Sequence, residues 1–252
     1  MRVAVILTLL MVSSSLAGCL GEDEPDYSGF EGCTEEEVQC EVELPQENET
    51  LPQENETLPQ ENETLPEGNE TNVGTWEGER VPQVTTLARG PNGTWEQWQL
   101  LDYIDTTWNN TTMMPWILIE FASTDCSHCW NYADDMELLH NQYRDNVTFF
   151  TFAVNFSSND NFNATLEEIA AFQDKTTYDG CYYGTKNCDE RPGPAHNWTY
   201  VDDRDQSEMI AFHSQGTPMF VIIRPDGIVE WHQEQNDESV VDALAALFPE
   251  EV

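Results

Sequence analysis

Basic residues are the scarcest feature of this 252-residue sequence. It holds 9 Lys and Arg against 48 Asp and Glu, a formal net charge of −39, and its only lysines are Lys175 and Lys186. So few cations cannot neutralise the phosphates of DNA or RNA, which excludes nucleic acid as a partner. The acidity fits either a surface adapted to high salt, where screening weakens self-repulsion, or simply an acidic extracellular protein.

Long apolar runs are also missing, apart from one near the start. Residues 3–12 are largely apolar, follow Arg2 and lead into small residues before Cys19. The run is too short for a permanent membrane-spanning helix, and its flanks predict a cleaved secretory signal over residues 1–18. Residues 16–19, Leu-Ala-Gly-Cys, resemble the lipobox of prokaryotic lipoproteins. We expect acyl chains on Cys19 to anchor the protein outside the cell membrane; the alternative is an ordinary signal with a chance cysteine.

The first third of the chain has too few large apolar residues to form a core. Residues 21–75 contain eighteen Asp or Glu and no Lys or Arg, which leaves 30 acids and 8 bases from Trp76 onward, a balance of −22. The heptapeptide Leu-Pro-Gln-Glu-Asn-Glu-Thr begins at 44, 51 and 58, and its proline excludes a coiled coil. We predict a disordered acidic linker over residues 19–75 and one folded domain over residues 76–252.

Asn-x-Ser/Thr glycosylation sequons are unusually frequent. The repeats carry four of them, at Asn48, Asn55, Asn62 and Asn69. Seven more follow, at Asn92, Asn109, Asn110, Asn146, Asn155, Asn163 and Asn197. This excess favours a glycosylated, archaeal cell surface over a typical bacterial periplasm; the alternative is an accident of composition that repeat duplication amplified.

The seven cysteines support an extracytoplasmic location, where thiols tend to be paired. Pairing by proximity gives the structural disulfides Cys33–Cys40 and Cys181–Cys188 and a third pair, Cys126–Cys129. In this assignment Cys19 is the one cysteine without a disulfide partner, and its thiol is free to carry the lipid. Six cysteines permit fifteen connectivities, so this assignment is one hypothesis among several.

One stretch carries recognisable chemistry, residues 116–129, Trp-Ile-Leu-Ile-Glu-Phe-Ala-Ser-Thr-Asp-Cys-Ser-His-Cys. Its apolar, β-branched start predicts a buried strand, and after a short turn Cys126 and Cys129 open a segment with helical periodicity. A cysteine at a helix N-terminus meets unpaired backbone N–H groups and the positive end of the helix dipole, which both favour thiolate. The pattern therefore indicates thiol–disulfide exchange.

The remaining patterns predict alternating strands and helices. Strands are expected over residues 81–87, 147–154, 219–223 and 228–232, with turns at 91–93 and 225–227. Helices are expected over residues 130–143, 205–212 and 239–248, with a helical turn at 100–104 and a capping box at Thr165. Residues 178–202 read as a long loop that the Cys181–Cys188 disulfide orders.

This order of elements resembles the thioredoxin superfamily, and within it the membrane-anchored TlpA-type thiol–disulfide oxidoreductases. The resemblance covers residues 81–248 and rests on three features: Val81-Pro82 with the Asn92-Gly93 turn, the strand and cysteine pair of 117–129, and Gly216-Thr217-Pro218 before Asp226-Gly227. It implies an α/β thioredoxin-like fold, with a central mixed β-sheet flanked by helices.

The resemblance also implies roles for individual residues. Cys126 would attack a substrate disulfide and Cys129 would resolve the mixed disulfide. Pro218 matches the family's cis-proline, which lies beside the thiol pair, and the Thr217 backbone would pair with the substrate. Glu120 matches a buried acid that moves the proton of Cys129; its alternative role is that of a hydrogen-bonded structural acid.

Residues beside the cysteines depart from the family's usual pattern. Asp125 replaces the tryptophan usual before the first cysteine, and its charge should disfavour a Cys126 thiolate. His128 should act in the opposite sense, because histidine there stabilises the thiolate of disulfide oxidases and isomerases. We expect Ser127 and His128 to face the substrate, and the direction of electron flow stays open.

We therefore expect an extracytoplasmic, lipid-anchored thiol–disulfide oxidoreductase that needs no cofactor. Its partners would be protein thiols and disulfides and a membrane redox partner. A metal-binding alternative is a thioredoxin-fold copper carrier that uses Cys126, Cys129 and either His128 or His213. A third reading is a non-catalytic surface module in which Cys126–Cys129 is an inert bridge.

Overall fold

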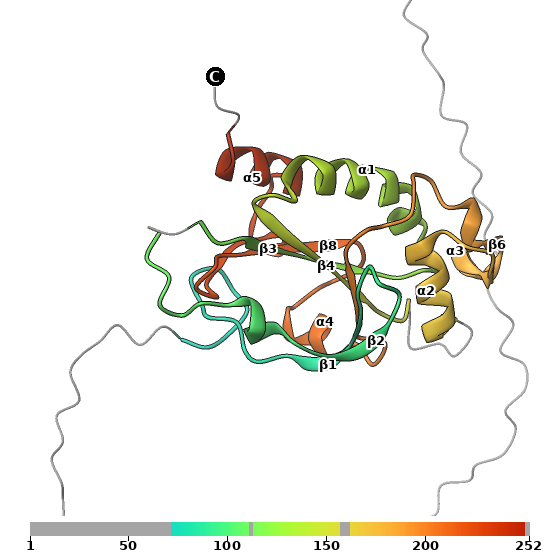
Figure 1. The fold of residues 1–252 in the computed structure, drawn as a ribbon, viewed down its shortest axis with the longest axis horizontal. Helices are drawn as coiled ribbons and strands as arrows, with labels where there is room; N and C mark the ends of the chain where they lie inside the picture. The colour runs from blue at the N-terminus through green and yellow to red at the C-terminus, as the bar shows by residue number, and fades with distance from the viewer. Residues whose placement is uncertain (1–71, 111–112, 157–161, 250–252) are drawn as a thin grey trace, which may run out of the picture. The chain divides into compact units, whose positions relative to one another are not determined.

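The computed structural model describes residues 72–110, 113–156 and 162–249. They form a seven-stranded sheet in the order β2-β1-β7-β4-β3-β8-β9 (Figure 1). Its strands are β1 (Thr85–Arg89), β2 (Trp95–Gln99), β3 (Trp116–Ala122), β4 (Val147–Ala153), β7 (Thr199–Asp202), β8 (Met219–Ile223) and β9 (Val229–His232). A small ladder joins β5 (Asp179–Gly180) and β6 (Lys186–Asn187). The α-helices are α1 (Ser127–Tyr143), α2 (Leu166–Asp174), α3 (Cys181–Gly184), α4 (Ser207–Ala211) and α5 (Val240–Leu247), and the 3-10 helices are η1 (Leu100–Tyr103), η3 (Cys188–Glu190) and η4 (Gln233–Gln235).

The sheet is mixed. β3 runs parallel to β4, and β4 runs parallel to β7. On the other side of β3, strands β8 and β9 pair antiparallel, and the β1–β2 hairpin joins β7 at the far edge. The sequence β3-α1-β4 followed by β8-β9-α5 is the arrangement that the thioredoxin resemblance implies. The predicted thioredoxin-like α/β fold is therefore confirmed.

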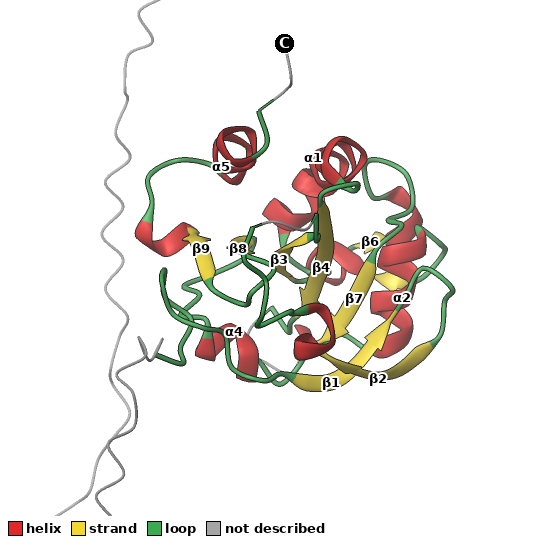
Figure 2. Cartoon of the chain, turned by 60° about the vertical axis from the view of Figure 1, so that its left-hand side comes forward, coloured by secondary structure: helices red, strands yellow, loops and turns green. Residues whose placement is uncertain are grey.

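Side-chain alternation along the central strands divides the core into two layers. Leu118 and Phe149 pack in the layer that contains residues of α1, α2 and α5. Ile119, Phe121 and Phe152 pack in the other layer, with residues of β1, β2 and η1. Figures 1 and 2 show α1 and α5 on one face of the sheet and α4 on the opposite face. Glu120 is two residues from Leu118 and so lies on the α1 face, where Cys129 also lies.

Some element boundaries differ from those predicted. The first strand begins at Thr85 rather than Val81, and α1 begins three residues before the predicted start because Cys126 is its N-cap. Thr165 caps α2 by accepting the backbone N–H of Glu168 at 3.1 Å. The Glu168 carboxylate, however, accepts a hydrogen bond from Thr124 instead of completing the predicted capping box.

The predicted loop over residues 178–202 holds more secondary structure than the sequence indicates. It contains β5, α3, β6 and η3 and ends in β7, which inserts into the large sheet between β1 and β4. Strand β7 is only four residues long, Thr-Tyr-Val-Asp, and follows a segment rich in Gly, Pro and Asn. Such a short strand has too little alternation to be predicted from its own residues.

The fold also includes residues assigned to the linker. Asn72 accepts the backbone N–H of Arg80, and Thr75 is 4% exposed and donates its hydroxyl to the Ala211 carbonyl at 2.6 Å. Other predicted features lie outside the described residues: the signal at 1–18, lipidation at Cys19, the Cys33–Cys40 disulfide and the sequons at Asn48, Asn55, Asn62 and Asn69.

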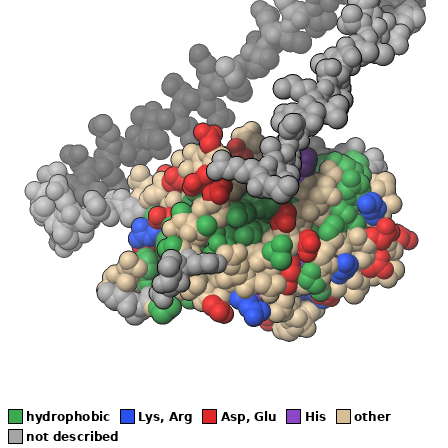
Figure 3. All heavy atoms as spheres, turned by 90° about the horizontal axis from the view of Figure 1, so that it is seen from above, with side chains coloured by type: hydrophobic (Ala, Val, Ile, Leu, Met, Phe, Trp, Pro, Cys, Tyr) green, Lys and Arg blue, Asp and Glu red, His purple; other side chains and the backbone are tan. Residues whose placement is uncertain are grey.

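Acidic side chains are spread over the face seen in Figure 3, and Lys and Arg side chains are few there. Within the described part of the chain, no helix combines the length and the apolar character that crossing a membrane requires.

Candidate active site

Cys126 lies at the point where the buried strand β3 turns into helix α1. Its backbone N–H donates to Ser123, and its extended φ and ψ make it the N-cap of the helix. Its Sγ accepts the backbone N–H of Cys129 at 3.2 Å, a bond that satisfies one of the unpaired donors of the first turn. The predicted geometry, a thiol at a helix N-terminus, is therefore present.

A second segment, 91 residues further along the chain, completes the site. The Thr217–Pro218 peptide bond is cis, as the resemblance implies. The Thr217 carbonyl accepts a hydrogen bond from Cys126 Sγ at 3.2 Å. The fold thus brings the cysteine pair and the Thr-Pro segment into direct contact.

The pKa values of the two thiols are shifted in opposite directions. Hydrogen bonds, the largest of them from the Cys129 thiol, lower the pKa of Cys126 to about 6, although burial acts against this. Burial raises the pKa of Cys129 well above its usual value, and the neighbouring Cys126 and Glu120 raise it further. Cys126 is therefore the thiolate near neutral pH, and Cys129 holds a proton that must be removed before it can react.

Glu120 is the buried acid on the same face of the sheet as the thiol pair. It is 3% exposed, and its Oε2 accepts a hydrogen bond from Thr151 on β4 at 2.7 Å. Burial raises the pKa of Glu120 to about 7, with the Thr151 hydrogen bond acting in the opposite sense. A carboxyl group that titrates near neutral pH can both accept and return a proton, as general acid–base chemistry requires.

A buried polar network, which the sequence analysis missed, continues from Glu120. Thr151 also accepts the Trp198 indole N–H at 2.9 Å, and its hydroxyl interacts with the Tyr200 phenol. The phenol lies 2.6 Å from His196 Nδ1, and His196 Nε2 lies 2.7 Å from Arg191 Nη1.

Nε2 of His196 has two neighbours with opposite demands. The Arg191 guanidinium can only donate to it, and the Ala133 carbonyl, 2.9 Å away, can only accept from it, so these contacts do not select one tautomer. Burial, together with the nearby cation of Arg191, lowers the pKa of His196 well below its usual value, so the imidazole is neutral. An isolated arginine and histidine in a polar loop gave no sequence signal of this arrangement.

The residues beside the cysteines point in different directions. His128 is exposed, whereas the Ser127 hydroxyl lies 3.1 Å from the phenol of Tyr183 on α3. Asp125 is 3% exposed, and its Oδ1 accepts the backbone N–H of Gly184 at 2.8 Å. Burial raises the pKa of Asp125, against hydrogen bonds from Gly184 and Tyr183. The pKa of Cys126 is lowered even though an acid directly precedes it in the sequence.

A groove of about 410 Å³ opens beside Cys126. Its lining residues are Cys126, His128, Asn155, Phe156, Tyr183, Gln206, Met209, Gln215, Gly216 and Thr217. Backbone and amide groups from the Thr217 segment and aromatic rings from Phe156 and Tyr183 therefore border the reactive sulfur. The aromatic residues are ones that the sequence analysis did not assign to the site.

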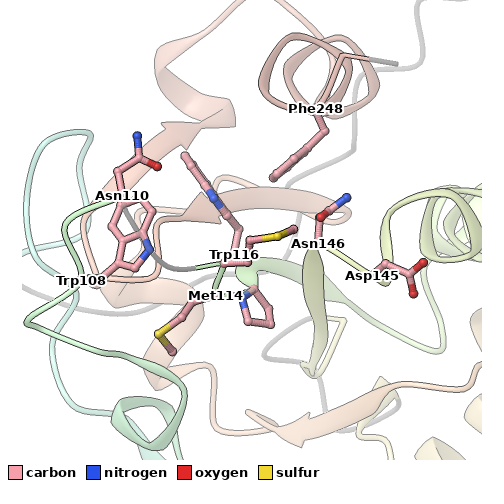
Figure 4. A pocket seen from close by; sticks show the side chains of 9 residues that line it. Trp108, Asn110, Met114, Trp116, Asp145, Asn146 and Phe248 are labelled. Atoms are coloured by element: carbon pink, nitrogen blue, oxygen red, sulfur yellow. The ribbon is translucent and has the colours of Figure 1, made fainter. Parts of the chain in front are cut away.

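A second pocket, of about 340 Å³, lies at the other end of β3, where the strand begins (Figure 4). Figure 4 shows Trp108, Trp116 and Phe248 around it, and Asn146, a predicted sequon, also lines it. Cys126 follows the opposite end of the strand, so the length of β3 separates this pocket from the thiols.

The other predicted sites have mixed outcomes. Cys181 and Cys188 form the disulfide that proximity predicted, and Cys126 and Cys129 are free thiols. Within residues 72–110, 113–156 and 162–249, no group of three or more His, Cys, Asp and Glu is arranged to hold a metal ion. His213, a possible copper ligand in the sequence analysis, stacks on Trp76 with ring centroids 4.2 Å apart.

No protein-family model matches the sequence, and no curated protein matches it either. The reduced 2-Cys peroxiredoxin of Plasmodium vivax is similar, with a TM-score of 0.47 and 15% identity over 69% of this chain and 80% of that one. The thioredoxin domain of a thiol–disulfide oxidoreductase from Bacteroides vulgatus gives a TM-score of 0.40 and 15% identity over 63% of this chain and 88% of that one.

The sheet order and the thiol pair of this chain define its class as a thioredoxin-like fold with a dithiol site. The solved structures similar to it include a 2-Cys peroxiredoxin and the thioredoxin domain of a thiol–disulfide oxidoreductase.

Proposed function

We propose that this protein is a thiol–disulfide oxidoreductase that acts on protein substrates through Cys126 and Cys129. The observation that carries the proposal is the hydrogen bonding of Cys126 Sγ, which contacts the Cys129 N–H at 3.2 Å and the Thr217 carbonyl at 3.2 Å. The thiol that makes these contacts has a pKa of about 6 and lines the groove of about 410 Å³, which would receive the substrate polypeptide.

In the reducing direction, the Cys126 thiolate attacks one sulfur of a substrate disulfide. This forms a mixed disulfide and releases the other substrate sulfur as a thiolate, which takes up a proton. Cys129 then loses its proton and attacks Cys126 Sγ, which breaks the mixed disulfide and frees the second substrate thiol. Two electrons pass to the substrate, and the Cys126–Cys129 disulfide remains. Oxidation of substrate dithiols is the same sequence reversed.

Glu120 is suited to the proton transfer in the second step. Cys129 must be deprotonated while it is buried, and the raised pKa of Cys129 makes that unfavourable without a base. Glu120 lies on the same face of the sheet, interacts electrostatically with both thiols and has a pKa of about 7. It would take the proton from Cys129 during reduction of a substrate and return it during oxidation.

The location of this activity is also part of the proposal. The lipobox-like Cys19, the acidic sequence of residues 19–71 and the sequons favour a lipid-anchored, glycosylated protein outside an archaeal cell membrane. A membrane redox partner would then recharge the cysteine pair after each turnover. The spacer would give the domain reach toward both that partner and its substrates.

The low pKa of Cys126 bears on the direction of electron flow. A stabilised thiolate favours the reduced form of the pair and so raises its reduction potential. We therefore propose a couple that is more oxidising than thioredoxin, whose potential is about −270 mV.

A turnover assay tests the proposal. The full chain should reduce the disulfides of a test protein when supplied with a dithiol, and Cys126→Ser should lower the rate at least about 100-fold because no thiolate remains to attack. The control is Cys33→Ser with Cys40→Ser, which removes a cysteine pair remote in sequence and should leave the rate unchanged. Equal turnover by Cys126→Ser would refute the proposed function.

A further inference from the structure

The disulfide-closed segment between Cys181 and Cys188 is bound directly to the residues that precede Cys126. The backbone N–H of Tyr182 donates to the Thr124 carbonyl at 3.0 Å, and that of Tyr183 donates to the Asp125 carbonyl at 3.1 Å. The N–H of Gly184 donates to the Asp125 carboxylate at 2.8 Å. Three consecutive donors of α3 therefore bind two consecutive residues beside the reactive thiol.

The backbone of α3 adopts an unfavourable conformation to present these donors. Tyr182 has a φ of 56°, Tyr183 a φ of 57° and Gly184 a φ of 66°. Two successive non-glycine residues in the left-handed region persist only where their surroundings hold them. Here the surroundings include the Cys181–Cys188 disulfide, whose two cysteines are fully buried. Strain of this kind is concentrated at functional sites.

The hydrogen bonds from α3 also determine the surroundings of the Asp125 carboxylate, which affects the thiol chemistry of Cys126. Asp125 is the residue directly before Cys126, and a carboxylate facing the sulfur would disfavour its thiolate. In the structure the carboxylate is buried and bound to Gly184 of α3. The negative charge of the carboxylate is thus stabilised by backbone N–H groups of the loop.

We propose that the Cys181–Cys188 loop is a positioning element for the thiol site, and that it sustains the reactivity of Cys126 by holding the Asp125 carboxylate away from the sulfur. The proposal rests on the proposed function only in taking Cys126 as the reactive thiol. It assigns a role in the redox chemistry to a disulfide, to α3 and to Asp125.

Other charged groups near the two residues are few. Glu168 of α2 faces Asp125, and its carboxylate accepts the Thr124 hydroxyl. Around Cys126 the titratable groups are Cys129 and His128 of α1 and Glu120 of β3. None of these is substituted in the variants below. Lys186, whose Nζ lies 4.5 Å from the Tyr182 ring centroid, belongs to the loop and moves with it, and Asp125→Asn separates its effect from that of the Asp125 charge.

The test is a cycle of variants in the full chain: the parent, Cys181→Ser with Cys188→Ser, Asp125→Asn, and all three substitutions together. The rate at which iodoacetamide alkylates Cys126 is measured against pH, with the site resolved by mass spectrometry. This readout needs no substrate turnover, so it can fail independently of the proposed function. Mass spectrometry also confirms that the parent keeps its Cys181–Cys188 bond.

We expect loss of the disulfide to raise the pKa of Cys126 by about one unit, which slows alkylation at pH 6 severalfold and at most about tenfold. Asp125→Asn alone should change the rate by less than about twofold, because the amide oxygen can still accept the Gly184 N–H. In the triple variant the slowing should largely disappear, since no charge remains to approach the sulfur. Equal slowing with and without Asp125→Asn would overturn the proposal, and so would no slowing at all.

A milder variant keeps the proposal testable if the disulfide variants do not fold. Gly184→Ala puts a Cβ at a φ of 66° with no other atom within 4 Å, so it disturbs the donor to Asp125 without a clash. Gly78→Ala is the matched control, because Gly78 also has a positive φ of 83° and open space around it. Gly184→Ala should slow Cys126 alkylation in an Asp125-dependent manner and Gly78→Ala should not. The same slowing in both would contradict the proposal.

Discussion

Cys126 is flanked in sequence by an acid and a histidine, and the structure gives these two side chains different surroundings. Asp125 is buried against α3, whereas His128 is exposed at the groove. From the sequence alone, Asp125 is expected to disfavour the Cys126 thiolate and His128 to favour it, and nothing indicates which effect is larger. Their effects on the sulfur differ because burial and hydrogen bonding change the charge of each side chain, and for Asp125 these depend on Gly184, 59 residues further along the chain.

Glu120 gives the sharpest prediction at the level of single residues. Burial raises its pKa from 4.5 to about 7 in the folded protein. The folded state therefore binds this proton more tightly than the unfolded state, and the resulting stability is fully present below pH 4.5 and lost as the pH rises through 7. Glu120→Gln should thus raise the free energy of unfolding at pH 8 by about 2–3 kcal/mol, measured by urea denaturation.

The same variant should lose activity while it gains stability. Without a base for Cys129, resolution of the mixed disulfide should slow at least about tenfold at pH 7. Glu168→Gln is a suitable control, because burial raises the pKa of Glu168 to about 7 too, yet its partner is Thr124 and not a thiol. If both variants retain full turnover, Glu120 is a structural acid only.

At the scale of elements, some parts of the fold follow from local sequence and others do not. Strands β3, β4 and β8 are apolar runs long enough to be recognised, and α5 is bounded by the cap that Ser239 provides. Strand β7 and helix α3 could not be predicted, because pairing with β1 and β4 and the Cys181–Cys188 bond stabilise them rather than their own sequence. The cysteine pair could be predicted from its spacing in the sequence. The buried polar network of Arg191, His196 and Tyr200 could not, because its members are brought together only by the fold.

Helix α4, which borders the groove through Met209, has a buried carboxylate at its N-terminal end. Asp203 is 1% exposed and accepts the backbone N–H groups of Glu208 at 2.9 Å and Met209 at 2.8 Å. Asp203→Ala removes both acceptors and should cost about 1–2 kcal/mol of stability in thermal or urea unfolding. Asp237→Ala, at an exposed acid, should be close to neutral. A cost below about 0.3 kcal/mol for Asp203→Ala would contradict this account of α4.

For the whole molecule, the net charge of −39 is the dominant property. Like charges repel across the folded surface, and salt screens them with a Debye length that falls from about 10 Å at 0.1 M to about 3 Å at 1 M. The melting temperature should therefore rise with KCl concentration over this range. An equal rise in an uncharged osmolyte would show a general exclusion effect, and no rise in KCl would favour the plain acidic extracellular reading over salt adaptation.

The central claim is that Cys126 and Cys129 form a reversible redox couple, and its reduction potential tests this most directly. The full chain would be equilibrated with glutathione redox buffers, and the state of the pair read by alkylation and mass spectrometry. The account predicts a reversible two-electron transition between about −270 and −120 mV. A pair that stays oxidised below about −300 mV would instead be an inert structural bridge and would contradict the proposed function.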